Sequence, residues 1–143
     1  MKNIVFADTN VFLDAILQRS PAGEDCGEIL EMAYAGDIKI YTSVSCLLNV
    51  IYFLQKADIP SQAIIEMMEQ LLKVISLSSP DEKNFSTALH AGFSDLEDAV
   101  QYHTALHVKG MDYFITSNLK DFKKATSQLP VLTPKQFMKK YNG

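Results

Sequence analysis

Short apolar runs alternate with segments of helical periodicity along most of the chain. The runs are rich in β-branched and aromatic residues, which is typical of buried strands. Strands separated by helices are joined by right-handed crossovers, so the pattern predicts a parallel sheet covered on both faces, a three-layer α/β/α fold. The predicted strands occupy residues 4–7, 37–42, 74–77, 111–116 and 131–132.

The segments between these strands predict helices. Thr9 or Asn10 is suited to cap the first of them. Two stretches have the form of a capping box, Ser79-Pro80-Asp81-Glu82, with proline at the first helical position, and Ser94-Asp95-Leu96-Glu97. Residues 117–122 form a loop or a single helical turn. The predicted helices span residues 11–17, 24–36, 43 or 45 to 54, 62–73, 80–91, 95–109 and a last segment from residue 134.

The apolar faces of three helices carry further expectations. The helix after the second strand is apolar on most sides, which predicts that it is buried. In the helix over 95–109, His103 and His107 are four residues apart, a spacing that can hold zinc. They fall on the predicted apolar face, which includes Leu96, and this favours structural histidines. Asp98 and Tyr102 are expected on another face. In the helix over 62–73, the residues expected to face inward are Ile64, Ile65, Met68, Leu71 and Leu72.

Length and composition indicate one globular domain over residues 1–143. The chain is 48% hydrophobic and 21% charged, values that exclude a disordered protein. No leader sequence or membrane-spanning run is apparent, so we expect a cytoplasmic protein. Cys26 and Cys46 lack the spacing of a metal site or redox motif and are expected to be buried free thiols.

Charge is distributed unevenly. The formal net charge is −4, which excludes a generally basic nucleic-acid-binding surface. Residues 1–119 hold 7 basic against 16 acidic side chains, a net −9, while residues 120–143 hold 6 lysines against one aspartate, a net +5. The lysines either face a polyanion or form a solvated surface. They are Lys120, Lys123, Lys124, Lys135, Lys139 and Lys140.

Acidic residues follow or precede two of the predicted strands. Asp8 ends the first strand, Asp121 lies just beyond the fourth, and Asp95 and Asp98 share one face of the helix that leads into the fourth. Ligands of open parallel sheets bind beyond the carboxyl ends of the strands. Carboxylates gathered there suit a hard cation such as Mg²⁺ or Mn²⁺. The alternative is helix capping by Asp8 and favourable placement of Asp95 and Glu97 at a helix N-terminus.

Three stretches together resemble the PIN domain family of metal-dependent ribonucleases, which includes the toxins of VapBC-type toxin–antitoxin pairs. They are ADTNVFLD, DLEDAVQYHTAL and ITSNLKDF, in the family's order and at its distances. The resemblance implies a five-stranded parallel sheet in the order 3-2-1-4-5. It also implies a Mg²⁺ or Mn²⁺ site and hydrolysis of single-stranded or looped RNA.

The resemblance assigns roles to individual residues. Asp8 matches the first metal-binding acid and Asp98 the third. Asn10 matches the polar residue that orients the first acid, and Thr116 the hydroxyl after the fourth strand.

The chain departs from the family pattern at two positions. Asn49 replaces the usual glutamate in the helix after the second strand, and Asn118 stands where a fourth acid is often found. Asp121, three residues further on, can substitute for that acid. An asparagine carries no charge, so the change at Asn49 is expected to weaken binding of a divalent ion.

The sequence therefore predicts a metal-dependent endoribonuclease, the toxin of a toxin–antitoxin pair. Asp8, Asp98 and Asp121 hold Mg²⁺ or Mn²⁺, with Asp95 and Asn49 as auxiliary groups. RNA, an antitoxin protein and a second copy of the chain are its expected partners. The alternative is a degenerate PIN-like module that binds RNA or a protein without cleavage. A phosphatase or receiver domain with Asp8 as phosphoryl acceptor is disfavoured, because DTN lacks the second acid of the DxD pattern.

Overall fold

The computed structural model describes residues 2–143 and contains a five-stranded parallel sheet. Its order, β3-β2-β1-β4-β5, confirms the predicted fold. The buried β1 at the centre pairs Ala7 with Ile115 of β4 and Phe6 with Tyr41 of β2. The strands are β1 (Asn3–Ala7), β2 (Ile38–Ser43), β3 (Ile75–Ser78), β4 (Tyr113–Ile115) and β5 (Val131–Leu132).

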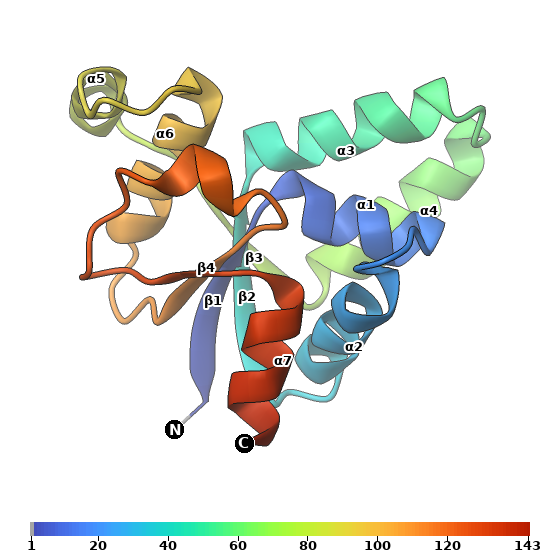
Figure 1. Cartoon of the computed structure of the whole chain (residues 1–143). Coiled ribbons are helices and arrows are strands. Elements are labelled where there is room, and N and C mark those ends of the chain that lie inside the picture. Colours follow the sequence, from blue (N-terminus) through green and yellow to red (C-terminus); the bar gives the residue numbers. More distant parts are fainter. Residues whose placement is uncertain (1) are drawn as a thin grey trace.

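Helices cover both faces of this sheet (Figure 1). Because alternate residues of a strand point to opposite faces, Val5 and Phe6 belong to two separate cores. One core packs against α1, α2 and α7, and the other against α6. The helices are α1 (Thr9–Leu17), α2 (Gly23–Tyr34), α3 (Val44–Lys56), α4 (Ser61–Leu72), α5 (Glu82–Leu89), α6 (Leu96–Leu106), the 3-10 turn η1 (Leu119–Phe122) and α7 (Pro134–Asn142).

Three helices begin differently from the sequence prediction. Asp8, not Thr9 or Asn10, is the N-cap of α1. Neither predicted capping box forms, because Asp81 and Asp95 occupy the N-cap positions of α5 and α6. In each case the aspartate has an extended backbone and its carboxylate accepts a hydrogen bond from a backbone N–H of the first turn. The short aspartate side chain therefore defines where these helices start.

The prediction that α3 is buried is wrong for one side of the helix. Cys46 and Val50 are buried, but Leu48 is 60% exposed, and Val44, Tyr52 and Phe53 are also exposed. The inward prediction for α4 holds for Ile64 and Leu71 and fails for Ile65 and Leu72, which face solvent. Figure 1 shows the cause: α3 and α4 run out past the sheet, so only one stripe of each helix meets the core.

The orientation predicted for α6 is also corrected. Leu96 is 55% exposed, whereas Tyr102 is completely buried and donates a hydrogen bond to the carbonyl of Leu129. The helix ends at Leu106, earlier than predicted. His103 packs edge-on against the ring of Phe93.

Two further expectations concern the cysteines and membrane spans. Cys26 and Cys46 are buried free thiols, as predicted. Within residues 2–143, no helix is long and apolar enough to cross a membrane.

Candidate metal centre

The central strands bring Asp8 and Thr116 side by side. Ala7 and Ile115 are partners across β1 and β4, so the next residue of each strand lies at the same edge of the sheet. The Thr116 hydroxyl donates to one oxygen of Asp8 (3.0 Å), and the Thr9 N–H donates to the other (2.8 Å). The Cys46 thiol lies 3.8 Å from the second oxygen. The carboxylate of Asp8 is thereby fixed on three sides.

Asp8 is buried in this position, with 7% of its surface exposed. Burial raises the pKa of its carboxyl group, although the hydrogen bonds from Thr9 and Thr116 favour the charged form. The negative charge of Glu97 raises the pKa further. A carboxylate held in this environment gains stability from a bound cation.

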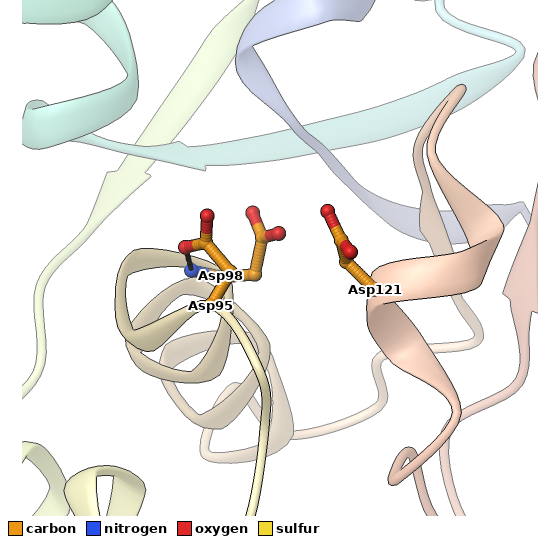
Figure 2. Close-up of side chains that lie close together, drawn as sticks. All are labelled: Asp95, Asp98 and Asp121. Atoms are coloured by element: carbon orange, nitrogen blue, oxygen red, sulfur yellow. Dashed lines mark hydrogen bonds between the residues drawn. The ribbon is translucent and has the colours of Figure 1, made fainter.

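A second group of carboxylates lies at the same edge. Asp95 and Asp98 project from the first turn of α6, and Asp121 projects toward them from η1 (Figure 2). One carboxylate oxygen from each of the three residues lies within 4.8 Å of the others. Asp95 also accepts a hydrogen bond from the Asp98 N–H (3.0 Å), so the helix cap and the cluster share one side chain.

The cluster concentrates negative charge. Burial, followed by the charges of Asp8, Asp95, Asp121 and Glu97, raises the pKa of Asp98 to about 7. Among the described residues, no Lys or Arg forms an ion pair with these carboxylates. A donor set made only of oxygen atoms with uncompensated charge fits a hard divalent cation.

A family model described as "PIN domain" matches residues 4–120. The chain belongs to the PIN domain family. No curated protein sequence is significantly similar to it.

Three solved structures with a similar fold come from toxin–antitoxin systems. A toxin–antitoxin complex from Klebsiella pneumoniae has a TM-score of 0.64 and 23% identity, covering 91% of this chain and 97% of that chain. VapBC2 from Rickettsia felis, bound to a promoter DNA fragment, has a TM-score of 0.64, 17% identity and coverage of 91% and 98%. VapBC-1 from nontypeable Haemophilus influenzae has a TM-score of 0.63, 16% identity and coverage of 92% and 98%. At these identities the likeness concerns the fold.

The structure groups the sequence-predicted residues of this PIN domain into two layers. Asp95, Asp98 and Asp121 form the outer cluster. Asp8 lies deeper, outside that cluster, and interacts with it through charge. Thr116 joins the layers, because its hydroxyl donates to Asp8 and accepts from the Asn118 N–H (3.2 Å).

The two asparagines that depart from the family pattern both hold an acidic residue. The side-chain amide of Asn118 donates to the carboxylate of Asp121. Asn49 on α3 donates to Glu97 on α6 at 2.6 Å. In the described part of the chain, Asn10 forms no hydrogen bond with Asp8.

The sequence predicts for Glu97 only a role at the start of a helix, and it predicts no role for Gln101. Glu97 meets Asn49, so a carboxylate does reach this position, although from α6 and not from α3. Gln101, one turn along, is 2% exposed and is held by the hydroxyls of Ser43 and Ser45. The spacing of Glu97 and Gln101, four residues apart on the helix that carries Asp98, was the available signal.

Proposed function

We propose that this PIN domain is a metal-dependent endoribonuclease that uses Mg²⁺ or Mn²⁺. The observation that supports it most is the gathering of Asp8, Asp95, Asp98 and Asp121 at one sheet edge with no basic partner among the described residues. When bound there, a divalent ion would polarise a water molecule and neutralise charge on a phosphodiester. The preference for RNA rests on the family resemblance.

Each acidic residue has a distinct task in this proposal. Asp98 and Asp121, whose carboxylates face each other from α6 and η1, hold the ion directly, and Asp95 completes the set. Asp8 contributes negative charge from its buried position beneath the cluster, where Thr116 and Thr9 fix the orientation of its carboxylate. Asn118 keeps the Asp121 carboxylate turned toward the ion.

Cleavage of a mixed RNA pool by the purified protein tests this function. We expect cleavage with Mn²⁺ or Mg²⁺, none in EDTA, and a loss of at least about 100-fold in Asp98→Asn, as for removal of a group that acts on the transition state. Asp37→Asn, an exposed aspartate before β2, is the matched control and should keep full activity. Equal cleavage by Asp98→Asn and the wild type would refute the assignment.

A second candidate is a PIN-like module that binds RNA or a protein without cleavage. Asn49 favours it, because a neutral amide replaces the family's second acid. Calorimetric titration with Mn²⁺ separates the two. Heat of binding that disappears in Asp98→Asn supports the nuclease, whereas no heat at millimolar metal supports the non-catalytic module.

We further propose that the chain is a toxin with an antitoxin partner, because the similar solved structures are toxin–antitoxin assemblies. The exposed apolar side chains of α3 and α4 offer a surface for that partner, and a cavity of about 400 Å³ lies between these helices, beside Ile64, Ile65 and Met68. Co-purification with a small protein encoded beside it, lost in Ile65→Asp, is expected. A dimeric mass for the isolated chain that becomes monomeric in Ile65→Asp would assign the surface to a second copy.

A further inference from the structure

A cavity of about 280 Å³ opens next to the acidic cluster, between α3, α5 and α6. Glu97 lines the cavity, and Asp98, the next residue, belongs to the cluster. The two features are therefore adjacent on the first turn of one helix. A ligand that reaches the cluster with one part can place another part in the cavity.

One wall of the cavity is apolar. Phe85 and Leu89 from α5 and Leu96 from α6 line it, and Phe85 remains 48% exposed. Exposed apolar side chains that lie together around a cavity are typical of a binding surface. An aromatic ring beside aliphatic side chains provides the flat apolar contact on which an unpaired base stacks.

A second wall is polar. Gln101 is fixed by Ser43 and Ser45, and Asn49 is fixed by its hydrogen bond to Glu97. In residues 2–143, the side-chain carbonyl oxygen of Asn49 accepts no hydrogen bond, so it and the second amide hydrogen are available to a ligand. A paired donor and acceptor on one amide is the arrangement that reads the edge of a base.

We propose that this cavity binds an unpaired nucleobase of the RNA strand, next to the phosphate that faces the acidic cluster. The inference rests on the proposed function and deepens it by naming where on this chain the base of an unpaired strand binds, a contact that duplex RNA cannot make. The polar wall favours a base over an apolar protein helix, because a helix would leave Asn49 and Glu97 facing hydrocarbon.

Binding of fluorescent twelve-nucleotide RNAs, followed by anisotropy in Ca²⁺, tests the proposal, with gels to verify that the strands stay intact. We expect wild-type protein to bind each homopolymer at least about 10-fold more tightly than an abasic strand of equal length, as for stacking of one or two bases. Phe85→Ser should weaken homopolymer binding about 5- to 100-fold and leave abasic binding unchanged.

Three further variants complete the design. Tyr34→Ser, an exposed aromatic on α2, is the matched control and should bind like the wild type. Asn49→Ala should narrow the differences in affinity among the four homopolymers, because it removes the side-chain amide that reads the base edge. Leu96→Ala repeats the test on α6 should Phe85→Ser fail to fold.

The outcomes separate this proposal from the nuclease function. Equal binding of base-bearing and abasic strands, with metal-dependent cleavage intact, would overturn the base pocket and leave the nuclease standing. Base-dependent binding that requires Phe85, in a protein that does not cleave RNA with any metal, would support the base pocket and refute the nuclease function. Conversion of a dimer to a monomer by Phe85→Ser, with RNA binding unchanged, would also overturn the pocket, by assigning it to contact between copies.

Discussion

Asp8 is both a helix cap and a buried acidic group beside the acidic cluster. It caps α1 through the Thr9 N–H, and its carboxylate also faces the acidic cluster from a buried position. A cap alone does not require burial, since Asp81 caps α5 while exposed. The combination is costly, because burial opposes the charge on Asp8 and raises its pKa.

Asp8→Asn should separate the two purposes. The amide oxygen still accepts from the Thr9 N–H, and the buried charge is gone. In EDTA we expect the free energy of unfolding to be unchanged or higher by ~1 kcal/mol, the usual size of relief from an uncompensated buried polar group. Mn²⁺ should raise the melting temperature of the variant much less than that of the wild type.

Urea denaturation in EDTA measures the first effect, and thermal melting with and without Mn²⁺ measures the second. Asp37→Asn, at an exposed aspartate that is not part of the cluster, serves as the reference. Destabilisation of metal-free Asp8→Asn by more than ~2 kcal/mol would mean that the charge itself stabilises the fold, contrary to this account.

The raised pKa of Asp98, about 7, predicts a pH-dependent metal affinity. A cation competes with the proton, so Mn²⁺ affinity should rise about 10- to 30-fold between pH 5.5 and 8 and then level off. In the metal-free protein the sign is opposite. The native carboxyl keeps its proton above the unfolded pKa of about 3.9, so stability falls as pH rises from about 4 to 7.

Isothermal titration with Mn²⁺ at several pH values, paired with melting curves in EDTA, tests this dependence. Asp98→Asn should flatten both curves. A flat affinity profile in the wild type would show that Asp98 does not hold the ion.

At the scale of elements, α6 does the most to assemble the site. Its first turn supplies Asp95 and Asp98 to the cluster and Glu97 to the adjacent cavity. Further along, Tyr102 anchors the segment that follows η1, because its hydroxyl donates to the Leu129 carbonyl (2.7 Å) and accepts from the Thr126 N–H (3.0 Å). One helix thus links the acidic cluster to the core beneath it.

Tyr102→Phe should destabilise the fold through this segment. The change removes one hydroxyl that satisfies two backbone groups and leaves the ring packing in place, so we expect a loss of ~1–3 kcal/mol. Urea denaturation measures the loss. Tyr34→Phe, an exposed tyrosine on α2, should change stability by less than ~0.5 kcal/mol. A similar small change in Tyr102→Phe would show that the hydroxyl does not anchor the segment.

On the scale of the whole molecule, the lysine-rich end of the chain divides into two groups. Lys120, Lys123 and Lys124 lie on or just after η1, the turn that carries Asp121. The other three lie on α7, which runs back toward the opposite end of the sheet, near the N-terminus of the chain (Figure 1). Only the first group is placed to contact a polyanion that reaches the cluster.

Replacement of the three η1 lysines by glutamine should therefore weaken RNA binding. For a single strand the slope of log affinity against log salt should fall by about 2, since each lost phosphate contact contributes about 0.7. The matched variant replaces Lys135, Lys139 and Lys140 by glutamine and should leave the slope unchanged. Anisotropy titrations over a range of salt concentrations measure the slopes. Equal slopes for both variants would refute the claim that only the lysines on or just after η1 contact RNA.

The sequence indicated most of the fold because the alternation of strands and helices is local. Predicted and observed strands overlap in all five cases. Its errors lay where a helix has neighbours on one side only. The periodicity of α3 records how many positions are apolar, and it holds no information on how far the sheet extends beneath them. Leu48 and Tyr52 therefore face solvent despite an apolar pattern.

The sequence by itself determined the parallel α/β fold, the acidic residues at strand ends and the unusual Asn49. The tertiary structure alone decided which of them meet. Asp8 and Asp98 are 90 positions apart in the chain, and their interaction depends on the pairing of β1 with β4 and on the packing of α6. The contact of Asn49 with Glu97 was decided in the same way, because it joins two helices that no local pattern relates.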